Sequence, residues 1–241
     1  MATTETPWCG TQADKLYLQS GQFSATIKTS LSVGGVDTGV NGIEWDGTNS
    51  PWAGTTAGKL YLQSGKFSAT LKTSLDISGV EAEVADISWD GTNTPFTGEI
   101  DDKLYLQSGQ FAATLKTSLD VNGVDSAPRG ISYDGSDTPW CGWGGSKLYC
   151  QSGQFSATIK TSLDVSGNDA APSGVTWDGT NTPWMGINSD KMYLQSGQFS
   201  VTIKTSLSVV GVDNAPTGIS TDDNDSRLGI EGVFTPTAVI F

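Results

Sequence analysis

The sequence contains no histidine. Histidine is the commonest general base of enzymes and a frequent metal ligand, so its absence removes both from the candidate chemistry. No other arrangement typical of a catalytic centre is visible. The recurring turn DGTN offers two oxygen side chains, whereas a calcium site takes six to eight ligands. We therefore expect a protein that is not an enzyme, and we expect no cofactor and no metal site.

Basic residues are also scarce. Thirteen Lys and Arg stand against 26 Asp and Glu, which gives a net charge of −13. Phosphate recognition needs a surplus of basic side chains, so nucleic acid and anionic membrane are not expected partners. No stretch approaches 18 consecutive apolar residues, and the N-terminus MATTETPW has no basic region with an apolar run. A membrane span and a signal peptide are therefore not expected.

Cysteine occurs three times, as Cys9, Cys141 and Cys150. The number is odd, and equivalent positions elsewhere in the chain hold Ala, Thr, Met or Leu. A disulfide framework would place Cys in every unit. We interpret these residues as small apolar core side chains.

What the sequence does contain is a repeat. The stretch KLYLQSGQFSATIKTSL at Lys15 returns at Lys59, Lys103, Lys147 and Lys191, each time 44 residues further on. Side chains alternate along 15–19 and along 23–28, with Ser-Gly between them, which predicts two strands joined by a tight turn. Two more short strands precede this stretch in each unit, such as GIEWD at 42–46 and PWAG at 51–54.

Four antiparallel strands in 44 residues, here named A to D in chain order, have the size of one β-propeller blade. The chain begins at a strand B, PWCG at Pro7, and its last recognisable element is a strand A at 218–222. The sequence therefore predicts an all-β, five-bladed propeller over residues 1–222, closed by the C-terminal strand A joining the N-terminal strands B–D. An open β-solenoid is the alternative, although nothing resembles its polar caps.

The blade motif SGVTWDGTNTPW at 173–184, with DKLY further along a unit, resembles the blade consensus of NHL, SMP-30 and related propellers. The near-identity of the units is similar to repeat propellers of bacteriophage virion and tail proteins. Because no catalytic constellation is visible, and because the repeats are similar to those of phage propellers, we expect a non-catalytic structural or adhesive module of a larger assembly, located in a virion or outside the cell, with other subunits as partners. A soluble multivalent lectin that binds glycans is one alternative. An engineered consensus-repeat propeller is another.

In a propeller the A–B and C–D turns share one face, here called the uniform face because its turns are nearly identical. The B–C and D–A loops share the other, here called the variable face. Polar residues of the A–B turns, and one aromatic residue of a variable loop, are the candidate ligand-binding residues: Asp46, Asn49, Asp90, Asn93, Asp134, Asp178, Asn181 and Trp143. Asp-Gly also satisfies tight turns by itself, so a purely structural role for the uniform face is the alternative.

Residues 223–241 lie outside the repeat register and form a separate C-terminal tail. Its apolar end, TAVIF, has high β-propensity and no charge, so it needs to be covered. We expect the tail either to fold back on the propeller or to bind a partner as an added strand. The candidate partner-binding residues are Val233, Phe234, Val239, Ile240 and Phe241.

Overall fold

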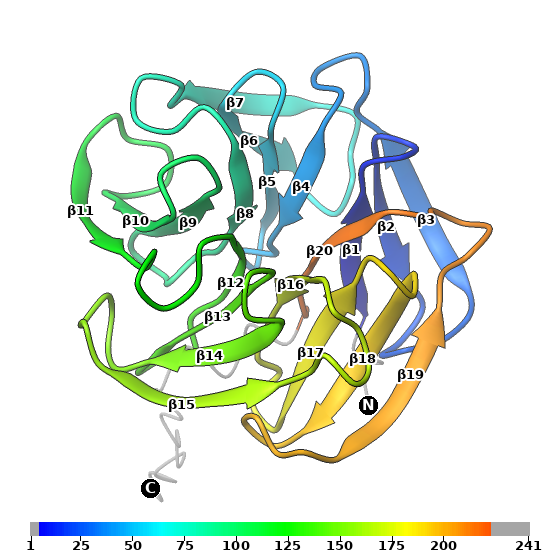
Figure 1. The fold of residues 1–241 in the computed structure, drawn as a ribbon. Helices are drawn as coiled ribbons and strands as arrows, with labels where there is room; N and C mark the ends of the chain where they lie inside the picture. The colour runs from blue at the N-terminus through cyan, green and yellow to red at the C-terminus, as the bar shows by residue number, and fades with distance from the viewer. Residues whose placement is uncertain (1–4, 223–241) are drawn as a thin grey trace, which may run out of the picture.

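A computed structural model describes residues 5–222. Five four-stranded antiparallel sheets surround a central axis, as the view in Figure 1 shows. The predicted five-bladed β-propeller is therefore confirmed. The tail and its candidate residues Val233, Phe234, Val239, Ile240 and Phe241 lie outside the described residues. Within the described part of the chain, no helix is long and apolar enough to cross a membrane.

Each blade runs from an inner strand beside the axis to an outer strand at the rim. The first consists of β20 (Pro216–Ile219), β1 (Thr6–Gly10), β2 (Lys15–Gln19) and β3 (Ile27–Ser32). The second has β4 (Val40–Ile43), β5 (Asn49–Gly54), β6 (Lys59–Ser64) and β7 (Leu71–Asp76), and the third β8 (Val84–Ile87), β9 (Thr94–Gly98), β10 (Lys103–Gln107) and β11 (Leu115–Asp120). The fourth has β12 (Pro128–Ile131), β13 (Thr138–Gly142), β14 (Lys147–Gln151) and β15 (Ile159–Asp164), and the fifth β16 (Pro172–Val175), β17 (Asn181–Gly186), β18 (Lys191–Ser196) and β19 (Ile203–Ser208).

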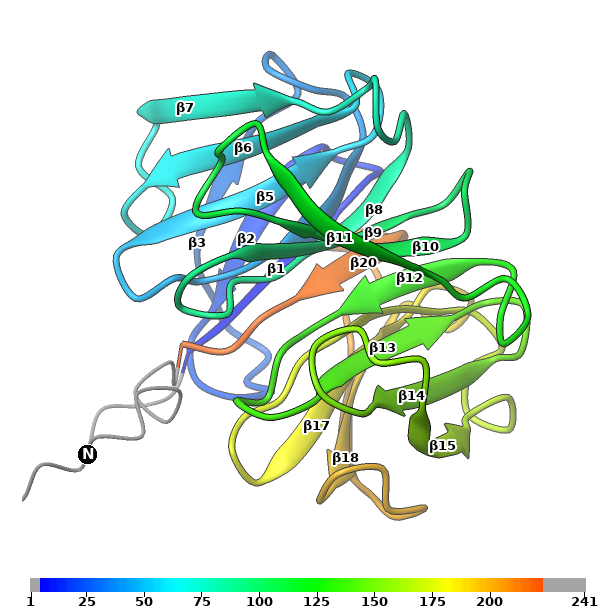
Figure 2. The same cartoon turned by 90° about the vertical axis from the view of Figure 1, so that its left-hand side faces the viewer.

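The two ends of the described chain meet in the first blade. Strand β20 pairs antiparallel with β1, so that Ile219 lies opposite Trp8, and the Ser220 amide donates to the Pro7 carbonyl over 2.8 Å. Figure 2 shows β20 and β1 side by side. The predicted closure is confirmed, and it pairs a strand edge that would otherwise be open.

The core lies between the blades and consists of repeated aromatic pairs. Trp8 stacks on Tyr17 with ring centroids 4.1 Å apart, and its indole Nε1 donates to Gln19. Every other blade stacks the equivalent pair, with Phe96 replacing Trp in the third. These strand B aromatics are 0 % exposed and pack against side chains of the preceding blade, as Trp52 does against Cys9 and Leu16. The three cysteines are also buried and free, as expected.

The predicted outer strand was misplaced. Residues 23–28 were expected to form it, but the strand begins at Ile27 and continues to Ser32. Phe23 instead has a φ of 59° and packs against the cluster of Trp8 and Tyr17. The connection is a wide turn closed by the Ser20 amide donating to the Thr26 carbonyl, so apparent alternation in this stretch did not indicate a strand. The inner strands likewise begin two residues earlier than expected and end at Ile43 in the second blade.

Replacing Phe96 by Trp is expected to stabilise the protein by about 1 kcal/mol, the usual net value of one hydrogen bond. In the other blades the Trp indole donates to a Gln of strand C, and in the third blade the buried Gln107 Oε1 has no hydrogen-bond partner. Urea unfolding of F96W checks this. The reverse change, W140F, orphans Gln151 Oε1 and should destabilise. An F96W variant less stable than wild type would contradict the interpretation.

Candidate functional site

The candidate residues of the uniform face organise their own turns. The Asp46 carboxylate accepts the amides of Thr48 and Asn49, and Asn49 Nδ2 donates to its other oxygen. Asn49 is 7 % exposed, and its Oδ1 accepts from Lys72 over 3.2 Å. The same contacts recur in the other predicted turns, at Asp90 with Asn93 and at Asp178 with Asn181, while Asp134 accepts the Asp137 amide. The structure thus brings each pair together; ligand binding by these residues stays a prediction.

The aspartates of these turns also connect neighbouring blades. Gln110, in the C–D turn of the third blade, donates to Asp46 of the second. Equivalent hydrogen bonds join Gln154 to Asp90, Gln198 to Asp134 and Gln22 to Asp178. The sequence alone did not indicate this role of the repeated QSGQ turn; its signal is that the same Gln and the same Asp recur at these four contacts between blades.

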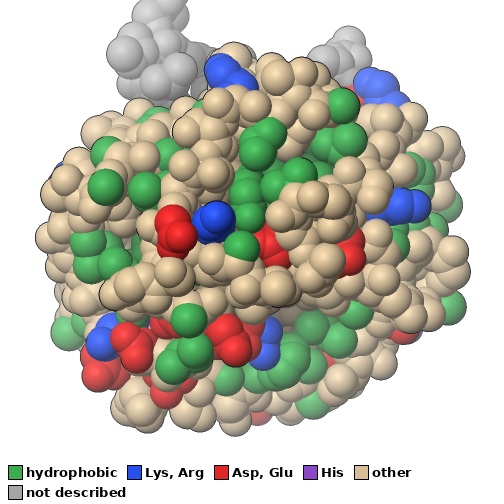
Figure 3. All heavy atoms as spheres, turned by 90° about the horizontal axis from the view of Figure 1, so that it is seen from above, with side chains coloured by type: hydrophobic (Ala, Val, Ile, Leu, Met, Phe, Trp, Pro, Cys, Tyr) green, Lys and Arg blue, Asp and Glu red, His purple; other side chains and the backbone are tan. Residues whose placement is uncertain are grey.

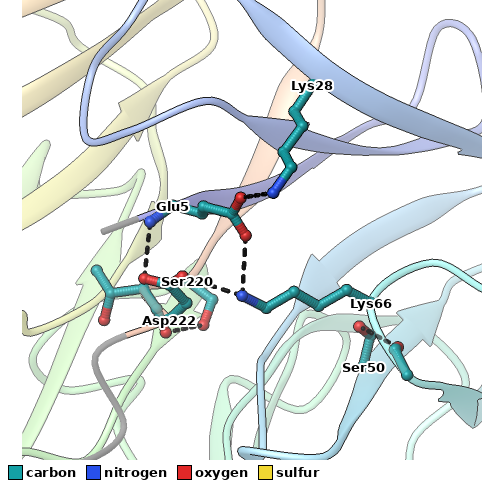
Figure 4. A network of polar contacts seen from close by, with 8 residues as sticks. Glu5, Lys28, Ser50, Lys66, Ser220 and Asp222 are labelled. Carbon is teal, nitrogen blue, oxygen red and sulfur yellow. Dashed lines mark hydrogen bonds and ion pairs between the residues drawn. The ribbon is translucent and has the colours of Figure 1, made fainter. Parts of the chain in front are cut away.

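At the seam of the ring, ion pairs replace these amide contacts. Lys66 stands where the other turns have Gln, and it bonds Asp222 over 3.0 Å and Glu5 over 2.9 Å. Glu5 occupies the position of Asn49 and also pairs with Lys28. Figure 4 shows Glu5 between the two lysines, with Asp222 beside them. Both departures from the repeat therefore lie where the two ends of the described chain meet.

Replacing Glu5 by Gln is expected to lower stability by about 1–2 kcal/mol at pH 7, in the range of charge-assisted hydrogen bonds. Burial raises the pKa of Glu5, but Lys28 and Lys66 outweigh it and hold the pKa below its ordinary value. A carboxyl with a depressed folded-state pKa contributes stability above its unfolded pKa and loses it as the pH falls through the folded one. Urea unfolding of wild type and E5Q should therefore differ at pH 7 and converge near pH 3. A difference that is constant with pH would contradict the ion pairing.

The uniform face also carries aromatic residues at the ends of four inner strands. Trp45, Trp89, Tyr133 and Trp177 are half-buried. Lys66 Nζ lies 5.0 Å from the ring centroid of Trp45. Burial, followed by the charges of Asp90 and Asp134, raises the pKa of Tyr133, which places this ring close to two aspartates of adjacent blades.

On the variable face, buried carboxylates hold the loops in shape. One carboxylate per D–A loop, 2–4 % exposed, packs under the B–C loop of the same blade: Asp37, Glu81, Asp125, Asp169 and Asp213. Asp125 accepts the amides of Gly144 and Gly145 over 2.9 and 2.8 Å, and the Tyr149 hydroxyl over 3.1 Å. The loops differ in sequence, but each is fixed by the same kind of contact.

These buried carboxylates also account for the glycine of the repeated PW-G motif. A Cβ built on Gly142 would lie 2.3 Å from Asp125 Cγ, and the equivalent glycines of the other blades meet equivalent carboxylates.

The buried carboxylates also affect the pKa of the tyrosines that they contact. Burial, with the adjacent charge of Asp213, raises the pKa of Tyr17 to about 12.

Trp143, the candidate aromatic anchor, lies on the variable face and is half-buried. The guanidinium of Arg129 covers its ring at 3.7 Å and pairs with Glu99 of the preceding blade. Burial lowers the pKa of Arg129, and it raises the pKa of Glu99. Two donors of this cluster, Arg129 Nε and Trp143 Nε1, are buried without a hydrogen-bond partner in the described chain.

Apolar side chains recur on the same face. Val36, Val80, Val124 and Val212 occupy equivalent places in four D–A loops and are 38–46 % exposed. Exposed acidic residues surround these loops, among them Asp76, Glu83, Asp101, Asp120 and Asp164. Figure 3 shows acidic and apolar side chains gathered side by side at the lower edge of that view.

One group of side chains in the described chain has the composition of a metal site. Ligand atoms of Asp134, Asp137 and Cys150 lie within 4.8 Å of one another. However, Lys160 Nζ bonds Asp137 over 2.5 Å, and Gln198 bonds Asp134. The Lys160 ammonium and the Gln198 amide therefore already bind the two carboxylates of this group.

Comparisons with known proteins identify the fold and no family. No family model matches the chain, and no curated protein matches it. Among solved structures, a nidogen/laminin complex matches with a TM-score of 0.61 at 13 % identity, over 91 % of this chain and 98 % of that chain. The glutaminyl cyclase of Myxococcus xanthus matches with a TM-score of 0.52 at 11 % identity, over 75 % and 69 % of the two chains. The virginiamycin B lyase of Staphylococcus aureus matches with 0.51 at 14 %, over 89 % and 69 %.

These neighbours correct one expectation and leave another without support. The expectation that the chain is not an enzyme is contradicted, because a cyclase and a lyase share its fold. At such identities the likeness shows the fold alone, and a fold does not assign an activity. The neighbours also include a protein solved in complex with another protein. The resemblance to NHL, SMP-30 and phage propellers is not confirmed beyond the propeller fold.

Proposed function

We propose that the chain is a docking module of a larger assembly and that it binds a partner protein through the variable face. The observation that carries this proposal is the recurrence of Val36, Val80, Val124 and Val212, exposed side chains on otherwise polar loops. Exposed apolar side chains that recur on one face are typical of a protein interaction site. The near-identity of the five units favours a bacteriophage virion or tail as the setting.

The charges of the variable face indicate the kind of partner. Exposed acidic residues flank the valines, and the whole chain carries a net charge of −13. A partner with a basic surface would meet this face with complementary charge, which accelerates association and makes it sensitive to salt. The buried carboxylates beneath the loops favour binding further, because a preorganised surface loses less entropy when it docks.

The test compares two matched fourfold variants expressed with an affinity tag in the native host. Val36, Val80, Val124 and Val212 are replaced by Ser in one variant, and the exposed Thr48, Thr92, Ser136 and Thr180 of the uniform face by Ala in the other. A partner that co-purifies with wild type should be identified by mass spectrometry, purified and titrated. We expect the valine variant to lose at least tenfold in affinity and the control variant to keep it. Equal affinity of both variants would overturn the proposal.

A multivalent lectin is the second candidate, and the half-buried aromatic residues beside aspartates on the uniform face favour it. Isolated protein on a glycan array tests it directly. Binding that the replacement of Trp89 and Trp177 by Ala abolishes would support sugar recognition at the uniform face. Absence of glycan binding, together with a partner lost in the valine variant, would leave the docking module as the function.

A further inference from the structure

A ring of polar side chains surrounds the axis, directly after the inner strands. Each blade contributes one residue, and all are at most 2 % exposed: Glu44, Ser88, Ser132, Thr176 and Ser220. Four are hydroxyl residues, and the second blade alone contributes a carboxylate. Inner strands of all blades meet around this axis in Figure 1. We call this set the axial ring.

The carboxylate of Glu44 reaches the two blades beside its own. Ser88 Oγ donates to one oxygen over 3.0 Å, and Ser220 Oγ donates to the other over 2.7 Å. The amide of Trp45 donates to the second oxygen over 3.0 Å. Glu44 therefore links its own blade to both neighbouring blades at the axis.

The remaining two hydroxyls lie on the blades opposite Glu44. Ser132 Oγ and Thr176 Oγ1 are buried and have no hydrogen-bond partner in the described chain. Their positions are equivalent to those of Ser88 and Ser220, whose hydroxyls bond Glu44. A buried hydroxyl without a partner is costly, so an orphan pair in the same ring as a buried carboxylate indicates a group bound between them.

Asp86 is a second acidic departure from the repeat near this axis, but its carboxylate has other partners. The other blades have Gly at this position, and Asp86 accepts the amides of Ile87 and Ile131 over 2.8 and 2.9 Å. Burial raises its pKa well above the ordinary value, and the nearby charge of Glu44 adds to this. We therefore do not count Asp86 among the ligands of the axial ring.

We propose that the axial ring binds one small, hard cation between the Glu44 carboxylate and the hydroxyl oxygens of Ser132 and Thr176. Hard cations such as Ca²⁺ take oxygen ligands. Ser88 and Ser220 donate hydrogen bonds to Glu44, and Ser220 Oγ also accepts the Trp45 amide over 3.1 Å. Ser88 Oγ therefore keeps both lone pairs for the same ion, and Ser220 Oγ keeps one. The ring then offers at least five oxygens and one negative charge. This inference does not depend on the docking function proposed above.

A buried water is the alternative occupant, because it too could satisfy orphan hydroxyls. A bound cation and a buried water differ in charge. Binding of a cation depends on the carboxylate and makes the melting temperature depend on ion concentration, whereas a water does neither. The chain offers a well-matched variant: Glu44→Ser installs the serine that three of the other blades already have, so folding is expected to be preserved.

The experiment unfolds the protein in urea with a chelator and refolds it with CaCl₂, MgCl₂, NaCl, KCl or, as reference, tetramethylammonium chloride. Scanning calorimetry then gives the melting temperature at matched ionic strength. We expect one of the four metal ions at saturating concentration to raise it by about 5 °C or more relative to the reference. Equilibrium dialysis, or metal analysis of the refolded protein, should find one such ion per chain.

Glu44→Ser should abolish this shift, and Ser132→Ala with Thr176→Val should reduce the affinity about tenfold. Glu83→Ser, which removes one exposed carboxylate far from the axial ring, should keep the response of wild type. No ion-specific shift in wild type would overturn the proposal and assign the ring to water. An equal shift in wild type and in Glu44→Ser would overturn it as well, because the ion would then bind elsewhere.

Discussion

Ending the chain before Gly218 is expected to abolish the single cooperative unfolding transition of the propeller. The truncation removes the end of β20, including Ile219, which lies opposite Trp8 and is 2 % exposed. It also removes Asp222 from the ion pairs with Lys66. The hydrogen-bonding edge of β1 then faces solvent, and an unpaired edge strand promotes association between chains.

The matched control ends the chain after Asp222, so that the closing strand is kept and only residues 223–241 are lost. Thermal unfolding and light scattering should show a cooperative monomer for the control and a broad transition or aggregates for the shorter chain. A monomer with an unchanged melting temperature in both would contradict closure by β20. The control also tests the tail: a folded propeller that no longer enters its complex would support a partner-binding role for 223–241.

Replacing Asp125 by Ala is expected to destabilise the protein by about 2–4 kcal/mol, because hydrogen bonds to a charged group contribute about 1.5–3 kcal/mol and a buried donor left unpaired adds to the loss. The carboxylate accepts the amides of Gly144, Gly145 and Ala127 and the Tyr149 hydroxyl. In the variant all four donors lose their acceptor at once, and the bond of the Tyr149 hydroxyl is a buried one. Urea unfolding measures the change.

Asp120→Ala is the control for this loss, because Asp120 is exposed and bonds only the amide of Asn122 two residues away. Its expected effect is about 0.5 kcal/mol. Asp125→Ala should also loosen the fourth B–C loop, which hydrogen exchange at 143–146 would detect. If the two variants were equally stable, the buried carboxylates could not be what holds the variable loops.

The propeller could be predicted from the sequence because a 44-residue period with four strands per unit leaves few architectures. Closure could be predicted because the first unit lacks the strand A that the end of the chain supplies. The start of the outer strand could not be predicted, because Phe23 has a left-handed backbone conformation in a turn while its ring still packs in the core. Alternation of side chains alone does not distinguish such a wide turn from a strand.

The contacts within the candidate sites were harder to predict from the sequence than the fold. Lys66 and Glu5 are visible in the sequence as departures from the repeat, but they are 61 residues apart and only the packing of the second blade against the first brings them together. In the sequence, the buried carboxylates of the D–A loops look like ordinary exposed loop residues. Their burial is evident only in the structure, where the absence of a side chain at Gly142 leaves space for Asp125. Function could not be predicted from the propeller pattern for a different reason: a cyclase, a lyase and a protein of a nidogen/laminin complex all share this fold.

Hydrogen–deuterium exchange of β20 tests the closed ring most directly. The Ser220 amide donates to Pro7, and β20 pairs with β1 as the other inner strands pair within their blades. Closure therefore predicts that peptides covering 216–221 exchange as slowly as those covering β8 and β16. Exchange of 216–221 at the rate of the exposed loop at 34–36, with β8 and β16 still protected, would show that the ring is open at this seam.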